Sequence, residues 1–69
     1  MTLIDIVRNT TERLLSEQQA QGKPSVVTYL DITKAINEDV LECMRELVRR
    51  GEYKGGVNIN KIPMLIKKQ

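Results

Sequence analysis

Residues that commonly carry out chemistry are few in this chain of 69 residues. It has no histidine and one cysteine, Cys43. Histidine is the commonest general base at neutral pH and the usual activator of a serine or cysteine nucleophile, so its absence argues against catalysis. A single cysteine forms no internal disulfide, and without histidine it does not complete a zinc site. The sequence therefore predicts a non-enzymatic protein with no cofactor, no metal and no small-molecule substrate.

Two local features look reactive and are better explained by structure. Cys43 lies at the border of an apolar helical stripe, and the carboxylates of Glu42 and Glu46 would raise its thiol pKa, which indicates a structural thiol. Gly55-Gly56 is the only glycine pair, but Lys54 precedes it, whereas the lysine of a phosphate-binding loop follows the glycines. Neither feature predicts a reactive site.

Charge is the property left for binding, and it is unevenly distributed. Residues 1–24 hold three acids and three bases, residues 25–52 hold six acids and four bases, and residues 53–69 hold four lysines and no acid. The net charge of +2 therefore lies at the C-terminal end. A nucleic-acid contact is predicted to use Lys34, Arg45, Arg49, Arg50, Lys54, Lys61, Lys67 and Lys68. Four phosphate contacts would give a salt slope of about −3.6, which suits weak backbone binding without base recognition.

Capping patterns at two places predict the first elements that position these side chains. The Thr-x-x-Asp patterns at 2–5 and 28–31 resemble capping boxes. The first predicts a helix from about Leu3 to Gln19, followed by a linker over 22–25 and a short strand over 25–27. The second predicts a helix over Tyr29–Ile36, which Asn37 ends in a left-handed conformation.

A third helix is predicted between Asn37 and Gly51, led by Glu38 and Asp39. Its apolar face comprises Val40, Leu41, Met44, Leu47 and Val48. Its outward face comprises Glu38, Glu42, Arg45, Glu46 and Arg49. Spacings of three and four residues place each arginine within reach of a glutamate on the same helix. The expected ion pairs are Glu42–Arg45, Glu46–Arg49 and Glu46–Arg50.

Alternating apolar and polar residues at the end of the chain predict a β-hairpin. Its turn lies either at Asn60-Lys61, between strands over 57–59 and 62–66, or at Gly55-Gly56, if Tyr53 and Lys54 pair instead. Pro63 has no N–H to donate, so the last strand should be an edge strand or should carry Pro63 on its unpaired side.

The order helix, strand, helix, helix, strand, strand resembles the winged helix-turn-helix family, and the spacing of residues from Ser25 to Lys67 is similar too. The matching positions are Thr28, Asp31, Ile32 and Asn37 in the second helix and Val40, Met44, Leu47 and Gly51 in the third. The resemblance implies an α+β fold, a small winged helix with three helices and a C-terminal hairpin, the wing. It also implies one domain over 1–69, with an N-terminal helix in 1–21, a helix-turn-helix-like unit in 25–51, and the wing and a basic tail in 52–69.

The third helix departs from the family pattern. Members of the family usually have about six positions between the turn and the first apolar residue of this helix, whereas Asn37 to Val40 spans three. The missing residues belong to the part that reaches bases in DNA-binding members. The resemblance therefore implies a small DNA-binding transcriptional regulator that contacts the phosphate backbone of a duplex mainly through its wing.

The alternative is a protein-interaction or dimerisation module of winged-helix type that binds an unidentified partner and no DNA. A core of Ile, Leu and Val without Phe or Trp is marginal at this size, so we expect a homodimer. The apolar face of the first helix is wider than one small core needs. Self-association is predicted for Leu3, Ile4, Ile6, Val7, Leu14 and Leu15. An edge strand around Met64 and Leu65 is the other predicted docking site.

Nothing in the sequence predicts a membrane protein. No apolar run approaches the ~20 residues of a membrane span. Asp5 interrupts the first apolar stretch and no basic segment precedes it, so no signal peptide is predicted and we expect a cytoplasmic protein.

Overall fold

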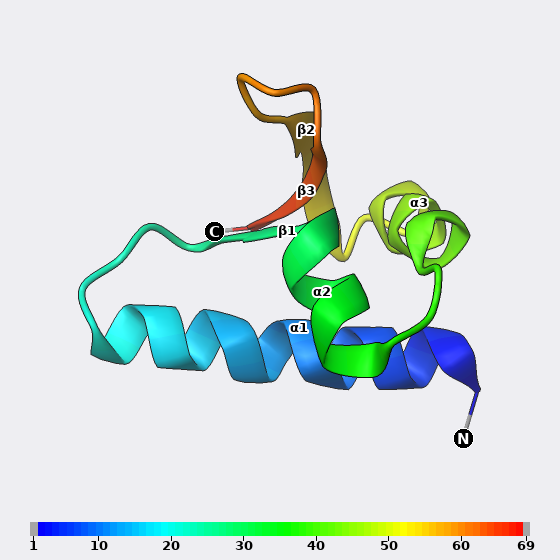
Figure 1. Ribbon diagram of the computed structural model, residues 1–69, viewed down its shortest axis with the longest axis horizontal. Helices are drawn as coiled ribbons and strands as arrows, with labels where there is room; N and C mark the ends of the chain where they lie inside the picture. Colours follow the sequence, from blue (N-terminus) through cyan, green and yellow to red (C-terminus); the bar gives the residue numbers. More distant parts are fainter. Residues whose placement is uncertain (1, 69) are drawn as a thin grey trace.

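Three helices and a three-stranded antiparallel sheet make up the computed structural model, which describes residues 2–68 (Figure 1). The elements are α1 (Leu3–Ala20), β1 (Val26–Thr28), α2 (Tyr29–Ile36), α3 (Leu41–Arg49), β2 (Tyr53–Val57) and β3 (Pro63–Lys67). This order confirms the predicted α+β class and the small winged-helix-like topology. The helices cover one side of the sheet, and the turn between β2 and β3 projects away from α1.

Both predicted capping boxes are present. The Thr2 hydroxyl accepts a hydrogen bond from the Asp5 N–H at 3.3 Å, and the Thr28 hydroxyl accepts one from the Asp31 N–H at 3.2 Å. Each aspartate carboxylate in turn accepts from the backbone N–H of its threonine. These bonds satisfy N–H groups that have no partner inside the helix, which fixes where α1 and α2 begin. Asn37 ends α2 with φ 64°, as predicted.

The prediction that Glu38 and Asp39 lead the third helix is wrong. Helix α3 begins at Leu41, and both acids lie in the preceding turn. The Asp39 carboxylate accepts from the Leu41 N–H at 3.1 Å and from the Tyr29 hydroxyl at 3.2 Å. A side chain that bonds a backbone N–H two residues ahead holds the chain in a non-helical conformation. Glu38 is therefore absent from the outward face of α3, contrary to prediction.

Strand β3 is the central strand of the sheet, between β1 and β2, so the prediction of an edge strand is wrong. The other predicted arrangement of Pro63 is confirmed. Pro63 lies opposite Val57 of β2, whereas the pairing with β1 starts at Met64. The Lys67 N–H donates to the Ser25 carbonyl on the β1 side. Because N–H direction alternates along a strand, the Pro63 nitrogen faces the same side, beyond the end of β1.

The hairpin turn lies over 58–62, which confirms the Asn60-Lys61 alternative. The strand predicted over 57–59 ends at Val57, and Gly55-Gly56 lies inside β2 instead of forming a turn. A Cβ atom at Gly55 would lie 3.2 Å from both methyl groups of Val48 in α3. Glycine here allows β2 to approach the helix closely.

The core fills the space between the helices and the sheet. Its buried apolar residues are Val7, Leu15, Val27, Ile32, Val40, Met44, Leu47, Tyr53 and Leu65. The Thr11 hydroxyl, also buried, donates to the Val7 carbonyl at 2.8 Å. Within residues 2–68, no helix combines the length and apolar content that a membrane span requires.

Candidate interaction face between helix α3 and the wing

The arginines of α3 are paired with glutamates of the same segment, as predicted. Arg45 lies 2.9 Å from Glu42, Arg49 lies 2.6 Å from Glu46, and Arg50 lies 3.0 Å from the second oxygen of Glu46. The outward face of α3 carries Glu42, Arg45, Glu46 and Arg49, so its formal charges cancel. Three of the predicted nucleic-acid contacts therefore already have an acidic partner.

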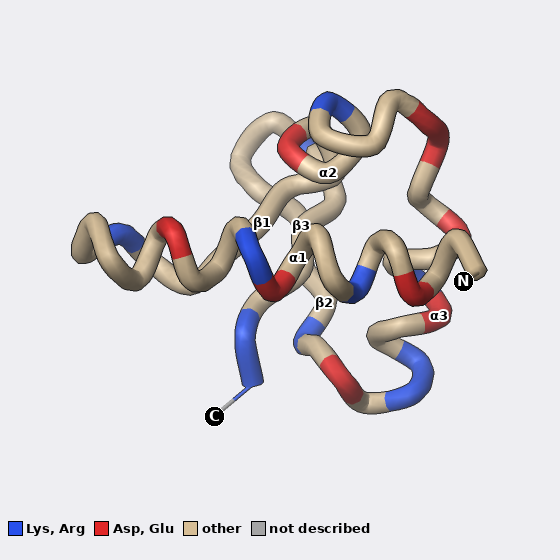
Figure 2. Tube along the Cα trace, turned by 90° about the horizontal axis from the view of Figure 1, so that it is seen from below, with Lys and Arg blue, Asp and Glu red and all other residues tan. Residues whose placement is uncertain are grey.

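The lysines predicted to contact nucleic acid are spread over the molecule (Figure 2). None of the ion pairs between described residues includes a lysine. Lys61 lies in the wing turn, and Lys67 lies at the other end of the hairpin, opposite Tyr53. Lys54 follows Tyr53, so its side chain points to the opposite face of the sheet from Lys67. Lys34 lies on the separate helix α2, and Lys68 follows β3. The structure does not bring these residues into one site.

An apolar groove of about 360 Å³ lies between α3 and the wing. Leu41, Met44, Arg45 and Val48 line it from α3, and residues 55–57 and 63–65 line it from the hairpin. Arg45 is the only charged residue among them. The groove is therefore an apolar surface with one arginine in its lining.

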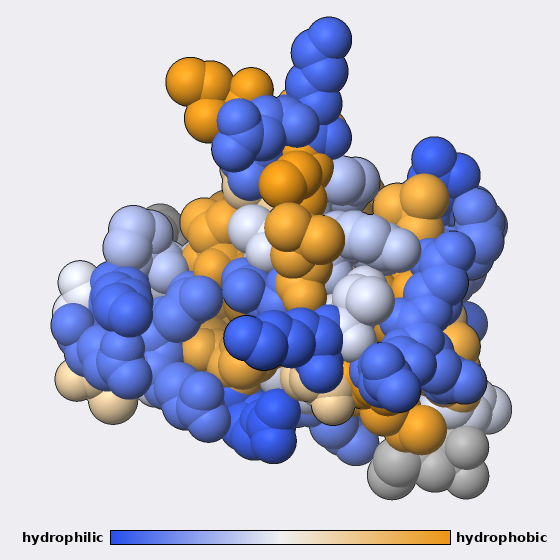
Figure 3. Space-filling model, viewed as in Figure 1, coloured by the Kyte–Doolittle hydropathy of each residue, from blue (hydrophilic) through white to orange (hydrophobic). Residues whose placement is uncertain are grey.

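Large apolar side chains of α3 and of the hairpin are exposed. Val57, which lines the groove, is 63% exposed, and Ile59, two residues further into the wing turn, is 96% exposed. Val48 of α3 is also exposed. In Figure 3, apolar side chains (orange) are visible along the sheet and at the wing tip, where they lie on the side of the hairpin away from α3. We call the groove, with the exposed Val57 that lines it, the α3–wing face. Exposed apolar surface of this kind marks interaction sites in proteins.

Asn58 holds the wing turn in one conformation. Its side-chain oxygen accepts from the Asn60 N–H at 2.9 Å and from the Ile62 N–H at 3.0 Å. Its backbone N–H donates to the Ile62 carbonyl at 3.0 Å, and its carbonyl accepts from the Lys61 N–H at 2.9 Å. Lys61 has φ 63°. Sequence reasoning missed Asn58, although an asparagine at the start of a turn is a signal for such bonds. Ile59 is therefore presented on an ordered loop.

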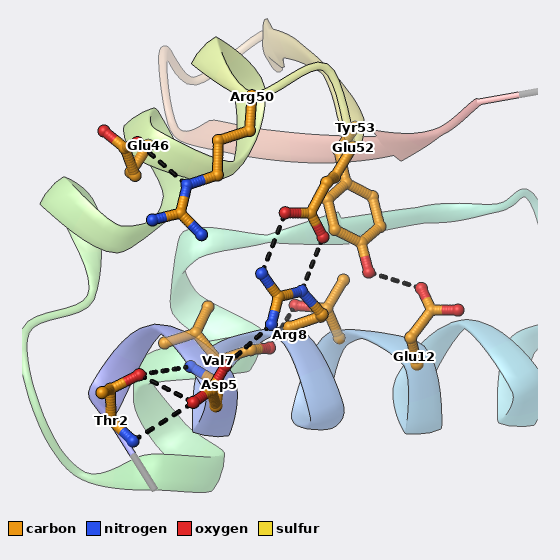
Figure 4. Close-up of polar contacts among 10 residues, drawn as sticks. Thr2, Asp5, Val7, Arg8, Glu12, Glu46, Arg50, Glu52 and Tyr53 are labelled. Carbon is orange, nitrogen blue, oxygen red and sulfur yellow. Dashed lines mark hydrogen bonds and ion pairs between the residues drawn. The ribbon is translucent and has the colours of Figure 1, made fainter.

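A polar cluster fixes the base of the wing to α1 (Figure 4). The Arg8 guanidinium binds both carboxylate oxygens of Glu52, at 2.6 and 2.9 Å, and also binds Asp5 at 2.8 Å. The Tyr53 hydroxyl donates to the Glu12 carboxylate. The hydrogen bond from Arg8 lowers the pKa of Glu52, and the bond from the Thr2 hydroxyl lowers the pKa of Asp5.

The same cluster raises the pKa of both donors. The bond to Glu52 raises the pKa of Arg8, and burial, followed by the bond to Glu12, raises the pKa of Tyr53. Both donors therefore keep their protons at neutral pH. Sequence reasoning missed this cluster because Arg8 and Glu52 are 44 positions apart in the chain.

The apolar residues predicted for self-association serve mainly the core of the monomer. Val7 and Leu15 are buried and offer no surface to a partner. Leu3, Ile4 and Leu14 are half-buried and pack against the core, and only Ile6, at 37%, is exposed. The prediction of docking along an edge strand at Met64 and Leu65 is wrong, because both residues lie in the central strand, whose two edges are already paired. Both residues do line the groove between α3 and the wing.

Cys43 is half-buried. Burial raises the pKa of its thiol, and the charges of Glu38 and Glu42 raise it further; Glu46, which we predicted would contribute, does not. Among residues 2–68, no group of three metal-binding side chains could hold a metal ion.

The α3–wing face therefore combines an apolar groove, the exposed side chain of Val57 and balanced charges on the adjoining helix. Similarity to characterised proteins adds nothing to this description. No protein-family model matches the chain, and no curated protein or solved structure shows significant similarity to it.

Proposed function

We propose that this chain is a non-enzymatic protein-interaction module of winged-helix type, which docks an apolar segment of a protein partner on the α3–wing face. The observation that carries the proposal is the apolar groove together with the exposure of Val57, which lines it. Burying one such side chain contributes about 1.5–3 kcal/mol. A partner that covers the exposed part of Val57 while it fills the groove gains a share of that amount.

The charges of α3 also favour a protein over a duplex. A DNA-binding surface needs cations that are free to face phosphates, because most of the affinity comes from releasing the counterions of DNA. On α3, Arg45 and Arg49 are paired with Glu42 and Glu46, and the carboxylates of these pairs would repel phosphate. A polar rim of paired charges around an apolar centre is the usual anatomy of a protein–protein interface.

Duplex DNA remains the second candidate, and the lysines of the hairpin and tail are the observation that favours it. Lys54, Lys61, Lys67 and Lys68 have no acidic partner within salt-bridge distance among the described residues. A transcriptional regulator that uses them would bind weakly, independently of sequence, and with the salt slope of about −3.6 expected for four phosphate contacts.

Two titrations of the ¹⁵N-labelled chain, followed by amide chemical shifts, separate these candidates. Isopropanol is the first probe, because its methyl groups resemble those of a valine side chain. We expect its shift changes to cluster at Val48, Gly55 and Val57, which line the groove. Random-sequence duplex DNA at low salt is the second probe, and we expect no saturable change.

A saturable response to duplex DNA at Lys61 and Lys67, together with isopropanol shifts that do not cluster at the groove, would overturn the proposal in favour of DNA binding. Isopropanol shifts spread evenly over the surface would also contradict it, because they would show that the groove does not prefer apolar groups.

A further inference from the structure

We propose that the segment docked on the α3–wing face is an extended peptide, which adds to the free edge of β2 as a fourth strand and alternates apolar with acidic residues. The inference rests on the proposed function and names the form of its partner. The open part of this edge is residues 55–57, which also line the groove.

Two residues of β2 direct their backbone polar groups away from the sheet. The strand order β1-β3-β2 makes β2 an edge strand. The Asn58 N–H donates to the Ile62 carbonyl, so Asn58 faces β3. Because backbone direction alternates along a strand, Gly55 and Val57 point their N–H and C=O groups the other way. The bond from the Lys67 N–H toward β1 leads to the same assignment through the register of β2 and β3.

These groups are accessible to a partner. Among residues 2–68, neither Gly55 nor Val57 makes a hydrogen bond outside the sheet. Gly55 is exposed, and because glycine has no side chain, its exposed atoms belong to the backbone. Tyr53 shares this edge but is buried, which limits the open stretch to residues 55–57.

The opposite edge of the sheet, along β1, is closed. The Val26 N–H donates to the Pro24 carbonyl at 2.9 Å and to the Gln18 side chain at 3.3 Å. The Thr28 N–H donates to the Asp31 carboxylate at 3.1 Å. An added strand would therefore find its partners on β2 and not on β1.

One face of β2 selects apolar side chains. A Cβ atom at Gly55 would point at Val48 of α3, so Gly55 faces the groove. In an antiparallel addition, the residue that exchanges hydrogen bonds with Gly55 directs its side chain to the same face. This side chain would meet Val48, which is itself exposed, so an apolar residue fits there.

The other face selects acidic side chains. Lys54 is exposed and has no acidic partner within salt-bridge distance among the described residues. Opposite charges at directly paired positions stabilise a sheet, and like charges destabilise it. An acid opposite Lys54 is therefore favoured. The hairpin of a second copy is disfavoured, because residues 53–69 hold four lysines and no acid.

The probe is a five-residue peptide of alternating valine and glutamate with valine at both ends, acetylated and amidated. Its titration into the ¹⁵N-labelled chain is followed by amide chemical shifts and hydrogen exchange. We expect the Gly55 and Val57 amides to exchange fast in the free protein and to become protected when the peptide binds.

Two N-methylated peptides test whether the backbone pairs. A methyl group on the central valine nitrogen removes the N–H that would pair with Gly55, whereas a methyl group on a glutamate nitrogen lies on the outer edge of the added strand. We expect the first peptide to bind about 10-fold more weakly and the second to match the unmodified peptide. Equal binding of the two would overturn the inference.

Lys54→Glu tests the charge contact, and Lys34→Glu is its matched control, because it makes the same change at an exposed residue of α2. We expect the first variant to weaken binding about threefold or more and the second to weaken it much less. Equal weakening would overturn the pairing of Lys54 with an acid.

Absence of peptide binding at millimolar concentration would also overturn the strand addition. In that case, isopropanol shifts that cluster at the groove would leave the proposed docking function standing, and evenly spread shifts would remove both. Protection of Gly55 and Val57 in concentrated protein without peptide would place a second copy on the edge and overturn the inference.

Discussion

Replacing Asn58 with alanine should loosen the wing turn and weaken binding at the α3–wing face at the same time. Alanine removes the acceptor of two hydrogen bonds, one from the exposed Asn60 N–H and one from the half-buried Ile62 N–H. A net value of about 0.5–1.5 kcal/mol for each bond, taken near its lower end for an exposed turn, gives a loss of about 1–2 kcal/mol. For a domain of this size, each kcal/mol lowers the melting temperature by about 4–8 °C.

Asn58→Asp is the matched control, because a carboxylate oxygen keeps the acceptor. We expect the aspartate variant to melt near the wild-type temperature and the alanine variant to melt about 5–15 °C lower. Amide exchange at Asn60 and Ile62 should accelerate only in the alanine variant. Binding at the face should weaken in the same variant, since Val57, the residue before Asn58, would be held less firmly. Equal melting temperatures and equal exchange rates for the two variants would show that the turn does not depend on Asn58.

Three further changes test other parts of the structure. Gly55→Ala should lower the free energy of unfolding, measured in urea, by about 1 kcal/mol, because the new Cβ would press on the stiff side chain of Val48 in α3. Gly56→Ala should leave this free energy unchanged or raise it by about 0.5 kcal/mol. Equal values for the two variants would contradict the close approach of β2 to α3. Lys61→Gly should raise the melting temperature, because glycine adopts a φ of 63° without strain, and the free energy of unfolding should rise by about 0.5–1 kcal/mol. A lower melting temperature would show that the lysine side chain stabilises the turn. Arg8→Gln should make the free energy of unfolding depend less on pH in the acid range. In the folded protein the pKa of Glu52 lies below its ordinary 4.5, so the stabilisation that Glu52 contributes is present above pH 4.5 and is lost as the pH falls through the lowered pKa. Urea midpoints from pH 7 down to pH 2 measure this, and parallel curves for the two proteins would refute it.

The helices could be predicted from the sequence because their limits depend on neighbouring residues. Thr28 and Asp31 form a capping box within one turn, and Asn37 supplies the left-handed residue that ends α2, so the predicted span of this helix is correct. The start of α3 was missed for a related reason. The Asp39 side chain bonds the Leu41 N–H, and sequence spacing alone does not distinguish that turn from a first helical turn.

The sheet and the candidate site could be predicted only in part, because they depend on contacts between distant residues. The position of β3 between β1 and β2 follows from pairing of β3 with Val26–Thr28, far away in the chain. The apolar width of α1 was interpreted as a partner surface, but Val7 and Leu15 are covered by the other elements of the same chain. The exposure of Ile59 could not be predicted either, because an alternating pattern of apolar and polar residues does not show where a strand ends and a turn begins.

The position of the docking surface is tested most directly by amide chemical shifts of the ¹⁵N-labelled chain during titration with isopropanol. We expect shift changes that cluster at Val48, Gly55 and Val57 and share one apparent dissociation constant. Changes confined to α1, around Ile6 and Leu14, would contradict the proposed position, because neither residue lines the groove.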